Sequence, residues 1–136
     1  MRDAYADQLD GIRNDLIAMS RLVRAAVARA TEALLNGDAL LAERVISDDA
    51  AIDRTREQIE ENSFELLSLQ NPVAGDLRML IAALRMVSEF ERMGDLSVHV
   101  AKIARLRVPN LAVPVCAGWR VWQHRGIPPG PTGVRR

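Results

Sequence analysis

The sequence is poor in aromatic residues, in cysteine and in net charge. Aromatic side chains make up only 4% of the 136 residues, and a composition dominated by Ala and Leu favours helices over sheets. The single cysteine, Cys116, cannot form a disulfide or a thiolate metal site within one chain, which fits a reducing compartment. The formal net charge is zero, so no overall basic field indicates nucleic-acid binding.

Long apolar runs are also missing. No run approaches the ~20 residues that a membrane span needs, and residues 1–7 lack the apolar core of a secretory signal. Hydrophobic residues nevertheless make up 49% of the chain, enough for one domain with a modest core. We therefore expect a cytoplasmic protein without a membrane span.

Helical periodicity dominates the first 107 residues. It predicts helices over residues 3–36 and 39–70 and a third helix ending near residue 107. Gly37 ends the first helix and Asp38 caps the second, while Asn71-Pro72 breaks the second and places Pro72 in the first turn of the third. Short connections between long amphipathic helices make them antiparallel neighbours. The fold class is therefore all-α, an elongated up-down-up three-helix bundle.

The apolar positions expected in the core follow the same periodicity. In the second helix Phe64, Leu41 and Leu69 are expected to extend an apolar face that repeats every seven residues. The core positions in the first two helices are Leu9, Ile12, Leu16, Met19, Val23, Ala26, Ala30, Leu34, Val45, Ile52, Ile59 and Leu66.

The composition changes near the end of the chain, which divides it into a bundle at 1–112 and a tail at 113–136. From Val115 onward the tail holds both tryptophans, several Gly and Pro residues and four Arg, but no acidic residue. Such a segment is typical of irregular or disordered structure. It is either a basic partner-binding tail or the out-of-frame ending of a GC-rich gene, and we favour the second.

The third helix carries an acidic motif between Met79 and Lys102. Leu77, Leu84, Glu91 and Val98 are spaced seven apart, the spacing of one inward-facing row. Asp95 and His99 follow Glu91 at successive turns on the same side of the helix. The spacing therefore predicts a ladder of two carboxylates and an imidazole on a row of core residues.

A buried carboxylate is costly unless something offsets its charge. One possibility is an ion pair with Arg85, Arg92 or an arginine from another helix. The other is a metal cation, because hard cations and iron take carboxylate and imidazole ligands. From the spacing alone, the ion pair is favoured.

Two further features accompany this motif. Asp49 and Asp53 form a second acidic pair one turn apart, for which a solvated helix face is favoured. Gly94 lies inside the third helix, where glycine costs about 1 kcal/mol relative to alanine. It is either a tolerated weakness or a bare backbone that another chain or an ion cluster approaches, and the sequence does not separate the two.

Three stretches resemble a known family. They are Val45-Ile46-Ser47-Asp48-Asp49 with Ile52-Asp53, Leu69-Gln70-Asn71-Pro72-Val73-Ala74-Gly75-Asp76-Leu77-Arg78, and Glu91-Arg92-Met93-Gly94-Asp95. Over residues 1–112 the chain resembles the PhoU family of phosphate-transport regulators, including its mycobacterial PhoY branch. The last stretch is similar to the family's E(D)xxxD signature.

The resemblance implies a cytoplasmic negative regulator of phosphate uptake and of the phosphate-starvation response, acting indirectly on transcription. It implies two partners, the ATPase subunit of the phosphate ABC transporter and a sensor histidine kinase, which would hold the protein at the inner face of the membrane. It also implies metal ions such as iron, manganese or zinc, with Glu91 and Asp95 as ligands. His99, where the family often has Asn, is a further ligand by our own inference, and Asp49 and Asp53 are additional acidic candidates.

The family pattern has two three-helix repeats, whereas this chain shows one acidic signature followed by the tail. We therefore expect a truncated or frameshifted copy, and a homodimer or higher oligomer that covers the apolar face a sister bundle would cover. Two alternatives are a metal-free helical oligomerisation or adaptor module and a di-metal carboxylate helix-bundle enzyme. The chain has no Glu-x-x-His motif of the kind that such enzymes use, so we expect no enzymatic activity.

Overall fold

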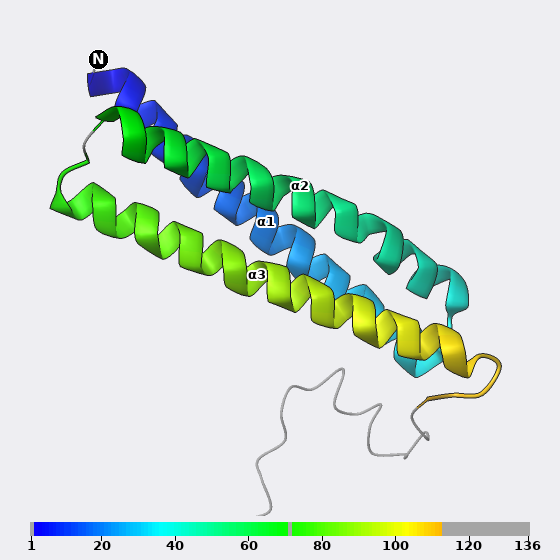
Figure 1. Cartoon of the computed structure of the whole chain (residues 1–136). Coiled ribbons are helices and arrows are strands. Elements are labelled where there is room, and N and C mark those ends of the chain that lie inside the picture. Colours follow the sequence, from blue (N-terminus) through cyan, green and yellow to red (C-terminus); the bar gives the residue numbers. More distant parts are fainter. Residues whose placement is uncertain (1, 71, 113–136) are drawn as a thin grey trace, which may run out of the picture.

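The computed structural model describes residues 2–70 and 72–112 and consists there of three long helices. They are α1 (Arg2–Asn36), α2 (Ala39–Gln70) and α3 (Ala74–Arg107). Figure 1 shows α2 running antiparallel to α1 and α3 in an elongated bundle, and each helix is about 50 Å long. The predicted all-α up-down-up bundle is confirmed. The predicted tail at 113–136 lies outside the described residues.

The turn between α1 and α2 forms as its sequence predicts. Gly37 has a positive φ of 64°, a conformation that glycine adopts at little cost. The backbone N–H of Asp38 donates to the carbonyl of Ala33 at 3.0 Å, which satisfies an otherwise unpaired carbonyl at the end of α1. The Asp38 carboxylate accepts from the backbone N–H of Leu41 at 3.0 Å and so caps α2.

The connection between α2 and α3 differs from the prediction by two residues. Helix α3 begins at Ala74, with Val73 in an extended conformation at its N-cap. Pro72 therefore precedes the helix and does not lie in its first turn, as we had expected. Asp76 does lie in the first turn, where its charge interacts favourably with the helix dipole.

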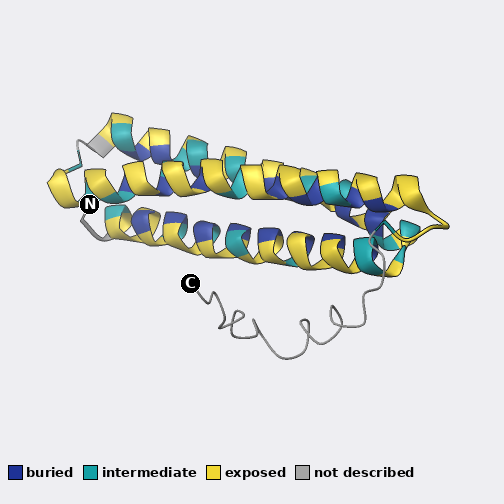
Figure 2. Cartoon of the chain, turned by 90° about the horizontal axis from the view of Figure 1, so that it is seen from below, coloured by how far each residue is buried: buried dark blue, intermediate teal, exposed yellow. Residues whose placement is uncertain are grey.

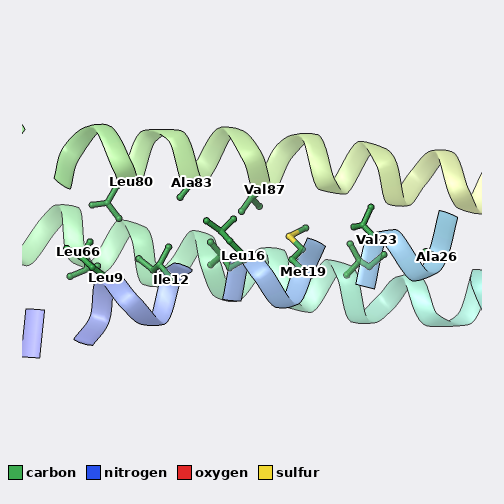
Figure 3. Packing of buried hydrophobic residues seen from close by; sticks show 12 residues of the cluster. Leu9, Ile12, Leu16, Met19, Val23, Ala26, Leu66, Leu80, Ala83 and Val87 are labelled. Carbon is green, nitrogen blue, oxygen red and sulfur yellow. The ribbon is translucent and has the colours of Figure 1, made fainter. Parts of the chain in front are cut away.

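The core is a seam of residues spaced alternately three and four apart, the pattern of helices packed along one face. In α1 the predicted core is confirmed, except that Leu34 is only partly buried. Figure 3 shows how the larger side chains of this seam, such as Met19 and Val23, meet α2 and α3. The buried seam of α1 consists of Leu9, Ile12, Leu16, Met19, Val23, Ala26, Ala30 and Ala33.

Polar residues interrupt the seam in α2. The predicted seven-residue repeat is buried. The seam position that lies between each pair of successive members is polar, and these positions are Asp49, Arg56 and Ser63. Phe64 and Leu69 are 60% and 69% exposed, so the prediction that they extend the core face was wrong. Both residues lie off the three-and-four spacing that faces α1 and α3.

The buried row of α3 is not the one predicted. The seam runs through Leu80, Val87, Gly94 and Ala101, whereas Leu77 is exposed and Glu91 is half-buried. The prediction followed the more hydrophobic heptad. The structure buries a row with Gly and Ala because small residues let α2 and α1 approach closely. Of the predicted row only Val98 is buried.

At the far end of the bundle the buried residues are mostly alanines, and the partly buried Leu34, Leu41, Ile46 and Val100 pack against them. Ala30, Ala33, Ala42, Ala101 and Ala104 form a separate cluster with Val45. Figure 2 shows buried residues along the inward faces of the helices and exposed residues over the outside. Within the described ranges, no helix is both long and apolar enough to cross a membrane.

Candidate acidic site

Glu91 lies at the edge of the α2–α3 seam and faces an arginine of α2. Its carboxylate forms an ion pair with Arg56, with 3.5 Å between Oε1 and Nε. The side chain of Glu91 is 37% exposed and that of Arg56 is 25% exposed. Of the ion-pair partners that the sequence allowed for this carboxylate, the structure shows an arginine from another helix. The prediction that Glu91 lies within the core was wrong.

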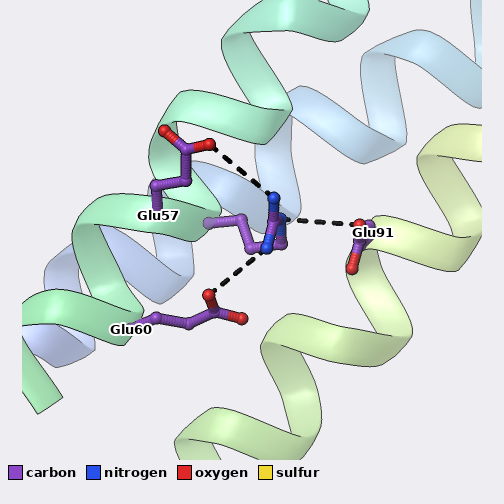
Figure 4. A network of polar contacts seen from close by, with 4 residues as sticks. Glu57, Glu60 and Glu91 are labelled. Atoms are coloured by element: carbon purple, nitrogen blue, oxygen red, sulfur yellow. Dashed lines mark hydrogen bonds and ion pairs between the residues drawn. The ribbon is translucent and has the colours of Figure 1, made fainter. Parts of the chain in front are cut away.

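Arg56 is the centre of a wider network, shown in Figure 4. Its guanidinium also lies 3.3 Å from Glu60 and 3.8 Å from Glu57, both on α2. Its Nε is buried and has no hydrogen-bond partner, since the 3.5 Å separation from Glu91 is long for a hydrogen bond. The Arg56 guanidinium thus forms ion pairs with three carboxylates, while its Nε–H remains without a hydrogen-bond acceptor.

Asp49 occupies the next polar position of the α2 seam and lies against Gly94 of α3. A Cβ atom on Gly94 would come within 3.3 Å of both Asp49 Oδ1 and Ile52 Cδ1. The bare backbone of Gly94 therefore permits a close approach, although from the sequence we had considered another chain or an ion cluster at this position. The neighbour that approaches is α2 of the same chain.

The environment of Asp49 is strongly acidic. Burial raises the pKa of the Asp49 carboxyl, and the charges of Asp53, Asp95 and Glu91 raise it further, whereas Lys102 lowers it. Asp49 and the three carboxylates that act on it, Asp53, Glu91 and Asp95, come from α2 and α3, and we call these four residues the acidic site. The sequence favoured a solvated face for Asp49 and Asp53. This is wrong for the half-buried Asp49, whereas Asp53 is exposed.

Asp95 and His99 continue from Glu91 along α3, but both are exposed. The prediction that they share a buried row with Glu91 was wrong, because this side of α3 lies at the edge of the α2–α3 seam and faces solvent. Asp95 remains close enough to Asp49 to raise its pKa.

The arrangement is not a formed metal cage. Within residues 2–70 and 72–112, no three His, Cys, Asp or Glu side chains are grouped so that they could hold one ion. Glu91 is engaged by Arg56, so a metal at this site would have to replace that ion pair. The site has more carboxylates than basic groups, and it lies beside Arg56, whose Nε–H lacks a hydrogen-bond acceptor.

Arg56 was the residue that sequence reasoning did not single out. A signal for it does exist, since Asp49, Arg56 and Ser63 are spaced seven apart and interrupt the apolar repeat of α2. A charged residue at such a position requires a partner of opposite charge on a facing helix. Glu91 supplies that partner.

The fold and the site together define a class of protein: a bundle of three long helices whose α2–α3 seam carries an acidic site. The family model for the PhoU domain matches residues 16–104, which include all of α2, the acidic site and most of α3. The chain belongs to the PhoU family.

Several curated proteins are similar to the chain. A protein from Mycobacterium tuberculosis named phosphate-specific transport system accessory protein PhoU homolog 2 is 50% identical over 114 residues, which are 84% of this chain and 54% of the relative. The PhoU homolog 1 of Mycobacterium leprae is 47% identical over 84% of this chain and 51% of its own length. The Aquifex aeolicus homolog is 39% identical over 73% of this chain and 45% of its own length. The chain thus spans about half the length of the curated relatives it matches.

Proposed function

We propose that this chain is an accessory protein of phosphate transport that acts by binding other proteins and does not catalyse a reaction. The names of its relatives support the link to a phosphate-specific transport system. The observation that carries the proposal is the acidic site itself. Asp49 of α2 meets Gly94 of α3 beside Glu91 and Asp95, inside the region that matches the PhoU domain.

As a negative regulator, the protein would lower phosphate uptake and repress the phosphate-starvation response when phosphate is plentiful. Its proposed partners are the ATPase subunit of the phosphate transporter and a sensor histidine kinase. Both contacts would place it in the cytoplasm, at the inner face of the membrane. Clustered carboxylates suit this role because they offer a charged surface to an arginine-rich or metal-bearing partner.

The full chain can be tested in a mycobacterium that lacks its own PhoU homologues. We expect its expression in phosphate-rich medium to lower phosphate uptake and the transcription of phosphate-starvation genes. Asp95→Asn should weaken this repression. Glu65→Gln, which removes an exposed acid of α2 outside the acidic site, should not. Unchanged uptake and transcription at matched protein levels would contradict the regulatory role.

We further propose that the acidic site binds iron, manganese or zinc. The support is electrostatic, since burial and neighbouring carboxylates disfavour the charged form of Asp49, and a cation would relieve that cost. Binding would require Glu91 to leave Arg56, after which Glu91, Asp95 and the α2 acids Asp49 and Asp53 could act as ligands. His99 is the candidate nitrogen ligand.

A metal-free adaptor is the second candidate function. The Arg56–Glu91 ion pair favours it, because a charge that arginine already offsets needs no cation. In that case the acidic site would bind a basic segment of a partner directly. Co-purification of the transporter ATPase subunit that survives a chelator would favour the adaptor. Loss of the complex on chelation would favour the metal-dependent form.

A further inference from the structure

Arg56 contacts three carboxylates through three different nitrogens. Its Nη1 donates a hydrogen bond to Glu60 Oε2 at 3.3 Å, and its Nη2 lies 3.8 Å from Glu57 Oε1. Both acids belong to α2, the helix that carries Arg56 itself. Its Nε lies 3.5 Å from Glu91 Oε1 of α3. The guanidinium therefore has two partners on its own helix and one across the seam (Figure 4).

The contact across the seam is the one that leaves a donor unsatisfied. Arg56 Nε is buried and has no hydrogen-bond partner, whereas Nη1 is hydrogen-bonded to Glu60. A buried donor without an acceptor is unfavourable. Arg56 therefore holds Glu91 by charge alone, and the loss of this contact would cost Arg56 no hydrogen bond.

Arg56 keeps its partners on α2 when Glu91 moves away. Glu60 lies one turn along the same helix, which is close enough for an ion pair without any contribution from α3. The Arg56 side chain is only 25% exposed, and a partly buried charge needs a partner of opposite sign. Glu57 and Glu60 supply it, so the release of Glu91 does not leave the guanidinium unpaired.

Glu91, once released, lies among other acids. Asp95 follows it one turn further along α3. Asp49 of α2 lies against Gly94, which stands between the two, because a Cβ atom on Gly94 would come within 3.3 Å of Asp49 Oδ1. Release from Arg56 therefore adds a third carboxylate to a place where acids of both helices already meet.

We propose that Arg56 competes with metal ions for Glu91 and so sets how tightly the acidic site binds them. In the metal-free protein Arg56 holds Glu91 across the seam. In the metal-bound protein Glu91 turns toward Asp95 and Asp49, while Arg56 stays on α2 with Glu57 and Glu60. The ion pair lowers the apparent metal affinity, because only molecules in which Glu91 is free are ready to bind. This inference rests on the metal binding proposed above.

Isothermal titration calorimetry of the full chain with zinc(II), manganese(II) and anaerobic iron(II) tests the proposal. Arg56→Gln removes the competitor, so it should lower the metal Kd about fivefold, the change that corresponds to a partly exposed ion pair of about 1 kcal/mol. The same variant should melt at a lower temperature than the wild type in chelator, because it leaves three carboxylates unpaired. A residue that only supports the fold would lower stability without tightening metal binding.

Lys102→Gln is the matched control for the loss of one positive charge. Burial raises the pKa of Asp49 and Lys102 lowers it, so the charge of Lys102 acts on the acidic site. Lys102 itself is exposed, and the guanidinium that faces Glu91 is that of Arg56. Lys102→Gln should therefore lower the Kd by no more than about twofold.

Arg56→Lys retains the charge and keeps the test open if Arg56→Gln does not fold, which circular dichroism reports. A lysine ammonium has no Nε–H directed at Glu91, and it lacks the fork through which the guanidinium contacts acids on both helices. Arg56→Lys should therefore also bind metal more tightly than the wild type.

The outcomes separate this inference from the metal site itself. The proposal would be overturned, and the metal site retained, if the wild type binds metal but Arg56→Gln binds it no more tightly than Lys102→Gln does, or Arg56→Lys no more tightly than the wild type. If neither the wild type nor an Arg56 variant binds any of the three metals, both proposals are overturned. Binding by an Arg56 variant alone would identify Arg56 as the competitor that closes the site.

Discussion

The carboxylate of Asp49 lies against the bare backbone of Gly94, so that a Cβ atom on Gly94 would come within 3.3 Å of Asp49 Oδ1. This contact joins the two acidic segments of the chain, because Asp49 belongs to the acidic pair of α2 and Gly94 lies between Glu91 and Asp95 of α3. Close approach of the helices half-buries Asp49 and brings it near two carboxylates of α3, Glu91 and Asp95, in addition to Asp53 of its own helix. The acidic site thus depends on a glycine as much as on its acids.

Side chains at position 94 should destabilise the bundle in proportion to their size. Gly94→Val should lower the free energy of unfolding by about 1–3 kcal/mol, because it overpacks the contact with Asp49 and Ile52. Gly94→Ala should change it by less than about 1 kcal/mol, since the gain in helix propensity offsets a small shift of those side chains. Urea unfolding measures both.

Gly11 provides the control for this series. It also lies inside a helix, but a Cβ atom there would meet nothing within 4 Å. Gly11→Ala should therefore stabilise the protein by about 0.5–1 kcal/mol. Equal effects at the two positions would show that contact with α2 does not constrain Gly94.

The raised pKa of Asp49 makes stability depend on pH. Between the unfolded pKa of about 3.8 and the higher folded pKa, the folded state holds more protons than the unfolded state, so stability falls as pH rises through this window. Asp49→Asn should therefore be more stable than the wild type at pH 7, and the difference should shrink toward pH 3. Thermal melts of both proteins from pH 3 to pH 7 would reveal it. A variant less stable than the wild type at pH 7 would contradict this sign.

The three helices could be predicted from the sequence within a few residues, because periodicity and the Gly37-Asp38 turn are local signals. The buried side of α3 could not. Two heptads compete there, and hydrophobicity favours the row with Leu77 and Leu84. The structure buries the row with Gly94 and Ala101. Which row fits depends on the space between α1 and α2, and this space is set only when all three helices pack together.

The acidic site was predicted in its composition but not in its geometry. Spacing alone identified Glu91 and Asp95 and drew attention to Asp49. The partner of Glu91 could not be named, because a contact between α2 and α3 depends on their relative height as well as on their faces. Arg56 pairs with Glu91 only at the relative height that α2 and α3 adopt in the folded bundle.

Ser63 is buried without a partner for its hydroxyl. Its side chain is 0% exposed and its Oγ makes no hydrogen bond, and a buried polar group left unsatisfied costs about 1–3 kcal/mol. Ser63→Ala should therefore stabilise the bundle by about 1 kcal/mol, with helix propensity contributing to the gain. Chemical denaturation at pH 7 measures the change.

Ser68 is the matched control for this substitution. It is an exposed serine of the same helix whose hydroxyl donates to the carbonyl of Glu65 at 3.0 Å. Ser68→Ala should change stability by no more than about 0.5 kcal/mol. Destabilisation by Ser63→Ala would indicate a hydrogen bond to Ser63 that the bundle makes through water.

Two substitutions in the acidic site separate metal binding from ion pairing. Glu91→Gln breaks the ion pair with Arg56, which at this partial exposure should lower stability by about 0.5–1 kcal/mol with a chelator present. Asp95→Asn removes a candidate ligand whose side chain is exposed and whose charge disfavours ionised Asp49, so in chelator it should be at least as stable as the wild type.

Added metal should then distinguish the variants. If the site binds iron, manganese or zinc, a hundredfold excess over Kd should stabilise the wild type and Glu65→Gln by about 2.7 kcal/mol, because the metal binds only the folded state. Neither Asp95→Asn nor Glu91→Gln should gain this stabilisation. Melting curves with chelator and with each metal, using anaerobic iron(II), give the answer. A wild type that none of the metals stabilises, together with a Glu91→Gln deficit that is the same in chelator and in metal, would exclude these metals and leave the acidic site as an ion-paired surface for a basic partner.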